Sequence, residues 1–223
     1  MHNEVSIMPK SIYSGGSFEL EEKKSRFIAH IEPITTEDEA TNFIQTMKKQ
    51  YYDARHNCYA FVIGDNSEIV RSSDDGEPSG TAGRPILEVL TAEGVTNAVC
   101  VVTRYFGGTL LGTGGLVRAY QGATKGALNN SVIIEKKEGI KFSVSCDYTD
   151  VGKLQYHFSS KDIRVLSSDY GACVSFNIVV ESDSFEAIKK DLTELTSGRA
   201  LIKIIEKCMF ADADKDVLVY PKD

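Results

Sequence analysis

The pattern of hydrophobic and polar positions changes near residues 131–139, where a helical spacing of apolar residues stops and strict alternation begins. On the C-terminal side of this boundary, each predicted element has the length and period typical of its type. The elements, in chain order, are a strand at 140–146, a helix at 151–158, strands at 163–165 and 174–180, a helix at 185–195 and a strand at 201–205. The predicted order is therefore strand, helix, strand, strand, helix, strand.

That order over about 70 residues is typical of the ferredoxin-like arrangement, in which an antiparallel sheet carries both helices on one face.

The N-terminal side has a less regular pattern. Its predicted elements are strands at 17–21, 27–31, 59–63 and 97–103, a helix at 40–47 and a helix through 86–90. Thr36 and Glu39 form a capping box before the first of these helices, and Pro85 is tolerated only in the first turn of the second. We therefore predict an α+β protein.

The predicted domains are residues 1–134 and 135–210, followed by an acidic tail at 211–223. A chain of 223 residues is long enough for two domains of about 100 residues each. Asp212, Asp214 and Asp216 have the spacing of a calcium loop, but Val217 stands where that loop needs glycine. We therefore predict a solvated tail.

Composition and charge restrict the class of protein. Hydrophobic residues make up 42% and charged residues 26%, as in ordinary globular proteins. No apolar run is long enough to span a membrane, and polar residues near Glu4 exclude a signal peptide, so a cytoplasmic location is predicted. Five scattered cysteines, with no Cys-x-x-Cys pair, are predicted to be buried thiols, and no metal site is expected. The net charge of −7 means that any nucleic-acid binding depends on a local basic patch.

Residues 94–134 form such a candidate patch, because they contain no Asp or Glu. At the chain's average of 32 acidic residues in 223, a window of this length would hold about six. The window includes Arg104, Arg118 and Lys125, although part of it is a buried strand that excludes charge anyway. On the predicted helix, Arg118 and Lys125 share one face with Gly122 and Asn129. This stripe fits a surface that follows a phosphate backbone and, equally well, a solvated helix face.

A glycine loop lies within the same window and leads from a strand end into the helix. Glycines let a ligand approach the backbone, and the free N–H groups of a helix N-terminus attract phosphate or carboxylate. Val117 occupies the position of the last glycine in G-x-G-x-x-G, and no Walker lysine is present, so nucleotide cofactors are not expected. The glycines are Gly107, Gly108, Gly112, Gly114 and Gly115.

Asp74, Asp75 and Glu77 form a second candidate site with two interpretations. Clustered carboxylates suit a magnesium ion or an acid and base pair, but beside glycine and proline they more often build a turn and cap the next helix. His56 and Cys58 are two residues apart on one strand face. Without a third residue to orient them, we predict packing in the core rather than a nucleophile.

Two segments, SSDDGEPSGTAGRPILEVL and VVTRYFGGTLLGTGGLVRAYQGA, together with DARHNCYA at 53–60, closely resemble the IMPACT family in its bacterial YigZ/YvyE branch. The resemblance implies an N-terminal UPF0029 domain of the ribosomal protein S5 domain 2-like type, similar to domain IV of elongation factor G. It also implies a DUF1949-type C-terminal domain that looks like domain V of that factor, in agreement with the element order derived above. Eukaryotic members carry an additional RWD domain that binds a regulator of a stress-response kinase. This chain has no counterpart before residue 17, so kinase regulation is not expected.

The resemblance implies a role in translation through ribosome or RNA contact, with no established reaction. The matching positions are Arg55, His56, Asp74, Asp75, Glu77, Arg104, Gly107, Gly108, Gly112, Gly114, Gly115 and Arg118. Our leading hypothesis is a cytoplasmic regulator that binds structured RNA or the ribosome through the acid-free face, with a protein of the translation machinery as a further possible partner. No motif for sequence-specific DNA binding is present.

Two alternatives stay open at this stage. The first is an enzyme acting on a small phosphorylated or acidic ligand, in which the loop at 107–115 and Arg104 hold the anion. In that case Asp74 or Glu77 supplies acid and base chemistry, although no catalytic residue can be assigned from the sequence. The second is a protein-binding adaptor that uses Tyr105 and Phe106.

Overall fold

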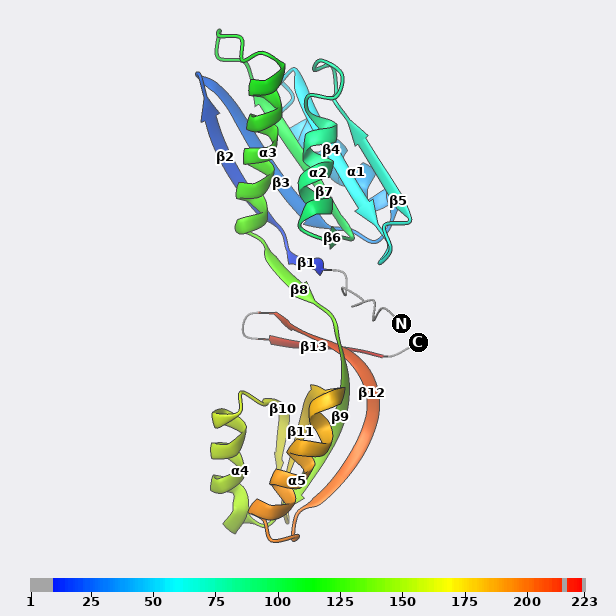
Figure 1. Ribbon diagram of the computed structural model, residues 1–223, viewed down its shortest axis with the longest axis vertical. Helices are drawn as coiled ribbons and strands as arrows, with labels where there is room; N and C mark the ends of the chain where they lie inside the picture. The colour runs from blue at the N-terminus through cyan, green and yellow to red at the C-terminus, as the bar shows by residue number, and fades with distance from the viewer. Residues whose placement is uncertain (1–9, 214–215, 222–223) are drawn as a thin grey trace, which may run out of the picture. The chain divides into compact units, whose positions relative to one another are not determined.

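The structure is a computed structural model that describes residues 10–213 and 216–221. The contacts within the chain divide it into two compact units, residues 1–135 and 136–223, and each unit combines helices with β-sheet (Figure 1). Only Lys136 separates the last strand of the first unit from the first strand of the second. The protein is thus a mixed α+β protein, as predicted.

The N-terminal unit is built on a five-stranded antiparallel sheet with the order β2-β3-β7-β4-β5. The strands are β2 Gly16–Glu22, β3 Ser25–Pro33, β4 His56–Ile63, β5 Ile69–Ser73 and β7 Ala98–Tyr105. Every side chain of β7 from Ala98 to Arg104 is buried, because this central strand has helices over both of its faces. That burial is the physical reason for its uninterrupted apolar run.

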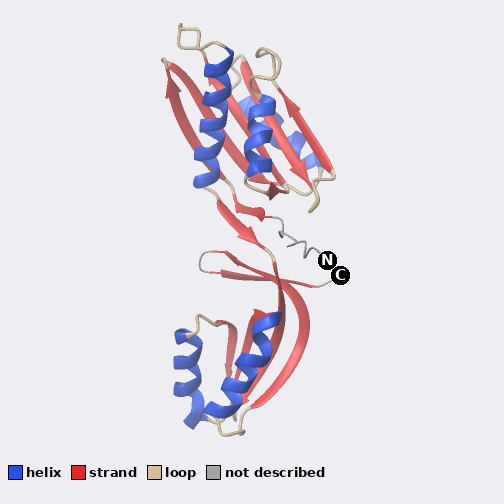
Figure 2. Ribbon diagram, in the orientation of Figure 1, coloured by secondary structure: helices blue, strands red, loops and turns tan. Residues whose placement is uncertain are grey.

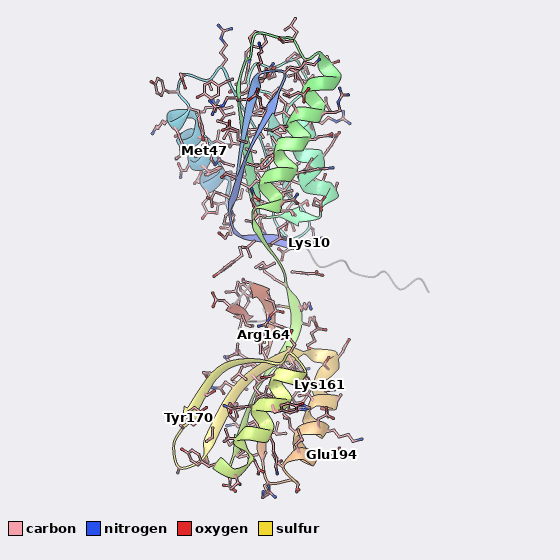
Figure 3. The ribbon with its side chains drawn as sticks, turned by 90° about the vertical axis from the view of Figure 1, so that its left-hand side faces the viewer. Lys10, Met47, Lys161, Arg164, Tyr170 and Glu194 are labelled. Carbon is pink, nitrogen blue, oxygen red and sulfur yellow. The ribbon has the colours of Figure 1, made fainter. Side chains whose placement is uncertain are left out.

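Helix α1, Glu37–Gln50, covers one face of this sheet, whereas α2, Gly83–Ala92, and α3, Thr113–Asn129, cover the other. Figure 3 views the sheet nearly edge-on, with α1 at Met47 on one side of the strands and α3 on the other. The predicted capping box is present, since the Thr36 side chain accepts from the Glu39 N–H and the Glu39 carboxylate accepts in return.

Two features of the N-terminal unit confirm or extend the sequence pattern. Pro85 lies in the first turn of α2, where no intrahelical N–H is lost, as predicted.

A second, three-stranded sheet has the order β6-β1-β8 and was not predicted. Its strands are β1 Lys10–Ser14, β6 Val95–Thr96 and β8 Val132–Glu135. Each strand has two to five residues, so none has enough positions to show a clear alternation.

The C-terminal unit has a second five-stranded antiparallel sheet, with the order β10-β11-β9-β12-β13. Figure 2 draws the strands of this unit in red and its helices in blue. Its elements are β9 Lys137–Cys146, α4 Tyr148–Ser160, β10 Arg164–Tyr170, β11 Val174–Glu181, α5 Phe185–Leu195, β12 Leu201–Ala213 and β13 Asp216–Pro221. Side chains from both helices, including Phe158 and Phe185, pack with Phe142 and Phe176 of the sheet in one core. Both helices therefore cover the same face.

Within the predicted solvated tail at 211–223, the described residues 211–213 and 216–221 form strands instead. Strand β12 continues to Ala213 and pairs antiparallel with β13, with Phe210 opposite Val219. Cys208 and Phe210 are buried against Val179, with Val217 and Val219 packed beside them. The sequence interpretation gave weight to the aspartates and overlooked this alternation of apolar residues. Asp212 and Asp216 lie in the two strands, while Asp214 is outside the described residues.

The cysteines differ from the prediction at one position. All five are free thiols, and four of them are buried, but Cys173 is exposed in the turn between β10 and β11. Among the helices that the structure describes, none is long and apolar enough to cross a membrane.

Candidate functional site

The candidate site lies at one end of the N-terminal sheet, where four connecting segments meet. They are the β2–β3 turn at 23–24, the segment 51–55 before β4, the loop 74–82 before α2 and the loop 106–112 before α3. Strand pairing brings Phe27 and His56 alongside Arg104, and this places the end of β7 next to the starts of β3 and β4. We call this region the loop end; it is uppermost in Figure 1.

A buried ion pair joins the end of β7 to the loop 74–82. The Arg104 Nη1 atom donates to Glu77 Oε1 over 2.7 Å, and the two side chains are only 7% and 3% exposed. The Tyr120 hydroxyl of α3 donates to the same Glu77 oxygen over 2.9 Å, and the Cys58 thiol donates to Tyr120 over 3.3 Å. Arg104 was predicted to be part of an exposed basic face, and this is wrong. Glu77 holds it inside the domain and compensates its charge.

Most N–H groups of the Arg104 guanidinium nevertheless have no hydrogen-bond partner among the described residues. It has five N–H donors, but its bond to Glu77 is its only hydrogen bond to a described residue. The Nε atom is buried without a partner. The guanidinium carbon lies 5.4 Å from the ring centre of Phe27 and 5.6 Å from that of Phe106, so the flat group is held by aromatic contacts.

Asp74 and Asp75 shape the loop 74–82, as the turn interpretation predicted. Asp74 Oδ1 accepts from the backbone N–H groups of Ala82 and Gly83 at the start of α2, and its Oδ2 accepts from Gly80. Asp75 accepts from the Lys48 ammonium through Oδ1 and from the Asn57 N–H through Oδ2. Asp74, Asp75 and Glu77 each contact different groups and do not face one another as an acid and base pair. No three His, Cys, Asp or Glu side chains gather as metal ligands within residues 10–213 and 216–221.

The stability of the loop 74–82 is expected to depend on pH through Asp74. Burial by itself would raise the pKa of Asp74, but hydrogen bonds from Gly80, Gly83 and Ala82 outweigh it and lower the pKa below the usual value. A lowered folded-state pKa contributes stability that is present above the unfolded-state pKa and is lost as pH falls through the folded-state pKa. We therefore expect the parent protein to lose more stability between pH 5 and pH 3 than Asp74→Asn. Chemical unfolding at several pH values measures this, and identical pH profiles of the two proteins would contradict it.

The candidate nucleophile pair, His56 and Cys58, does not provide a reactive thiol. Cys58 is fully buried, and burial raises the pKa of its thiol far above the usual value, so the thiol stays protonated. His56 differs from the prediction of core packing, because it is half-buried and faces a cavity. Its Nδ1 lies 2.9 Å from the Asp75 carbonyl oxygen. Because a carbonyl only accepts, Nδ1 carries the proton there, and in the neutral ring Nε2 is the acceptor.

A cavity opens at the loop end. It has a volume of about 420 Å³ and is lined by Asp53, Arg55, His56, Arg104, Tyr105, Phe106 and Leu110. Phe106 is 54% and Leu110 84% exposed, so apolar surface borders it. The Tyr105 hydroxyl donates to Asp53 Oδ1 over 2.6 Å, and this bond is the main cause that raises the pKa of Tyr105 to about 12. The cavity thus combines acidic, basic and apolar groups.

The predicted glycines have separate structural roles. A Cβ atom on Gly107 would lie about 2.0 Å from the backbone carbon of Lys24, so the close neighbour of this glycine is the β2–β3 turn and not a ligand. Gly108 and Gly112 have φ angles of +83° and +71°, which favour glycine. Gly114 and Gly115 lie in the first turn of α3, which has no side-chain cap and no acidic residue.

Exposed cations that form no ion pair with a described residue occur at the loop end and along α3. Arg118 and Lys125 are exposed on α3, as predicted, and Arg55 is exposed beside the cavity. Lys23 and Lys24 are exposed at the tip of the β2–β3 turn and were missed by the sequence interpretation, although two lysines between two short strands were a visible signal. None of these five forms an ion pair with another described residue.

The backbone of the β2–β3 turn strengthens this observation. Lys23 and Lys24 have φ angles of +47° and +67°, a conformation that a two-residue hairpin turn requires and that Asn and Gly adopt at lower cost. Lysine side chains at a strained tip are more costly than the residues usually found there. This cost is consistent with a use for the two charges at the loop end.

Fold and site together define the class: a two-unit α+β protein whose first unit carries, at one end of its sheet, a cavity lined by charged and apolar side chains. Comparison with known families assigns residues 23–128 to the Impact N-terminal domain and residues 144–199 to a domain of unknown function, DUF1949. The chain belongs to the IMPACT family. The loop end lies entirely within the first of the two matched regions.

Relatives of similar length support this assignment. The chain is 42% identical to the IMPACT family member YvyE of Bacillus subtilis, over 86% of this chain and 89% of that protein. It is 35% identical to the IMPACT family member YigZ of Escherichia coli, over 83% and 92%. A solved crystal structure, described as that of a hypothetical protein, matches 91% of this chain and 99% of its own, with 32% identity and a TM-score of 0.56.

Proposed function

We propose that this protein acts in translation by binding structured RNA, on or off the ribosome, through the loop end of its N-terminal unit. The observation that carries the proposal is the set of exposed cations that form no ion pair with a described residue, Lys23, Lys24 and Arg55 at that end and Arg118 and Lys125 along α3, together with the exposed Phe106. Cations bind phosphates without sequence preference, and aromatic rings stack on unpaired bases. We propose a cytoplasmic location to match, with a protein of the translation machinery as a further partner.

The charge distribution of the N-terminal unit supports this surface. Several cations elsewhere in this unit have carboxylate partners, as in the pairs Arg26–Glu19, Arg84–Glu88 and Arg71–Glu37, whereas Lys49 on α1 forms no ion pair with a described residue. Arg118 and Lys125 have no such partner and lie seven residues apart on α3, about 10 Å along the axis. This spacing lets the two side chains contact different phosphates of one nucleic-acid backbone.

We further propose the fold assignments that the family resemblance implies. The C-terminal unit would be a ferredoxin-like domain, as in domain V of elongation factor G. The sheet order β10-β11-β9-β12, with α4 and α5 on one face, supports this assignment. The N-terminal unit would be of the S5 domain 2-like type, similar to domain IV of the same factor. A pair of domains that resembles part of a translation factor is consistent with ribosome contact.

RNA binding through this surface is expected to depend on salt. Each cation that neutralises a phosphate releases about one counterion, so the logarithm of the association constant falls linearly with the logarithm of salt concentration. Arg118→Ala and Lys125→Ala should each reduce the slope of this plot by about 1. Arg118→Glu should weaken binding more than Arg118→Ala, because it adds repulsion. Fluorescence anisotropy with a labelled RNA hairpin at four salt concentrations measures the slope.

The control for this experiment is Lys161→Ala. Lys161 is an exposed lysine at the end of α4 in the other unit, labelled in Figure 3, and it has no ion-pair partner among the described residues. Its replacement should leave the slope unchanged. If the Arg118 and Lys125 variants stay folded and bind the hairpin as tightly as the parent at every salt concentration, the proposed RNA function is wrong.

A further inference from the structure

The cavity at the loop end has a balanced set of charges. Arg55 and Arg104 contribute two positive charges, while Asp53 lines the cavity and Glu77 is bound to Arg104. These four charges cancel. An anion placed inside would meet the Asp53 carboxylate and would find Arg104 already compensated, so the cavity does not favour a phosphate or a free carboxylate.

The hydrogen-bonding groups of the cavity favour a neutral polar occupant. Arg104 is more than nine-tenths buried; its Nε is enclosed, and three N–H groups of its two terminal nitrogens have no hydrogen-bond partner among the described residues. Asp53 accepts one hydrogen bond from Tyr105 through Oδ1, and its Oδ2 has no partner among the described residues. A neutral His56 offers an acceptor at Nε2. The occupant must therefore present both acceptors and donors.

The apolar groups of the cavity favour a flat occupant. Phe106 exposes 54% of its surface, and one of its faces is directed towards the Arg104 guanidinium. Leu110, 84% exposed, adds a second apolar side chain at the same place. A volume of about 420 Å³ is in the range of small-molecule pockets.

We propose that this cavity binds one unpaired nucleobase, with Arg104 donating to acceptors of the base, Asp53 accepting from its N–H groups and Phe106 stacking on its ring. A nucleobase is planar and neutral and presents donors and acceptors along its edges, as the cavity requires. Arg55, exposed beside the cavity, then contacts the adjoining phosphate. This inference deepens the proposed function and rests on it, since it names the part of the RNA that is recognised.

Two variants test the nucleobase directly, with nucleoside 5′-monophosphates and inorganic phosphate as probes in calorimetric titrations. Phe106→Ala should weaken mononucleotide binding about 5- to 150-fold, the range that corresponds to loss of one base–aromatic stack. Asp53→Asn should also weaken it, because a carboxylate acceptor is lost while the side-chain shape is kept. Tyr52→Ala is the matched control, since Tyr52 is 85% exposed and does not line the cavity. Melting temperatures confirm that all variants are folded.

The Asp53→Asn variant separates base recognition from phosphate recognition. If the cavity holds a phosphate, removal of the negative charge strengthens binding and inorganic phosphate competes with mononucleotides; this result overturns the inference. Absence of mononucleotide binding to the parent protein overturns it as well. A free nucleotide and a nucleotide within RNA share this chemistry, and a labelled single-stranded hexamer compared with a mononucleotide distinguishes the two sources.

The same variants distinguish failure of this inference from failure of the proposed function. If Arg118→Ala lowers the salt slope but Phe106→Ala binds RNA and mononucleotides like the parent, RNA binding stands and the nucleobase site is wrong. If the parent binds mononucleotides through Phe106 but binds no RNA, the nucleobase site stands and the proposed RNA function is wrong.

Discussion

Replacing Glu77 by glutamine is expected to lower the free energy of unfolding of the N-terminal unit by about 3–5 kcal/mol. Glutamine keeps the shape of the side chain and an oxygen that accepts from Tyr120, but it removes the charge that compensates Arg104. Arg104 is only 7% exposed, so its positive charge would then be buried without a counter-charge. Urea unfolding followed by circular dichroism measures the loss.

Two further variants show whether charge is the cause. The double variant Glu77→Gln with Arg104→Met removes both charges and should recover most of the lost stability, because two neutral side chains leave no buried charge. Glu88→Gln breaks the exposed pair with Arg84 and should change stability by less than about 1 kcal/mol. A loss at Glu77 no larger than the loss at Glu88 would show that the buried pair is not a main determinant of stability.

The substitution Gly107→Ala is expected to destabilise the N-terminal unit by about 3 kcal/mol. The added Cβ would lie 2.0–2.4 Å from the backbone atoms of Lys24 and Ser25, and backbone cannot move aside as the end of a flexible side chain can. The clash must separate the loop 106–112 from the β2–β3 turn and break the bond from the Gly107 N–H to the Ser25 hydroxyl. Differential scanning calorimetry should show a melting temperature lower by on the order of 10 °C.

Gly114→Ala is the control, because it makes the same chemical change seven residues further along the chain. A Cβ atom at Gly114 would meet only the end of the flexible Arg118 side chain, at 3.7 Å, and the residue lies in a helix. Alanine is favoured over glycine in a helix, so this variant should be slightly more stable than the parent. Equal destabilisation by both substitutions would show that the contact with the β2–β3 turn is not what requires Gly107.

Local patterns in the sequence predicted much of the secondary structure. Strand β7 was recognised from its apolar run, and α1 from its stripe and its capping box at Thr36 and Glu39. These signals depend on neighbouring residues in the chain, because a helix or a buried strand imposes its period on its own sequence. The short strands of the β6-β1-β8 sheet and the extension of β12 depend on partners far away in the chain, so they carried little local signal.

The sequence by itself also determined which residue types are present at the site: the arginines, the glycine loop and the carboxylates of the loop 74–82. It could not determine which of them are neutralised. Arg104 and Glu77 are 27 residues apart, and only the packing of β7, α3 and the loop 74–82 buries them as a pair. The same packing leaves Arg118 and Lys125 exposed and unpaired, and brings Asp53 and Phe106 to one cavity. The function of a charged side chain depends on its burial and its nearest counter-charge, and both of these are properties of the tertiary structure.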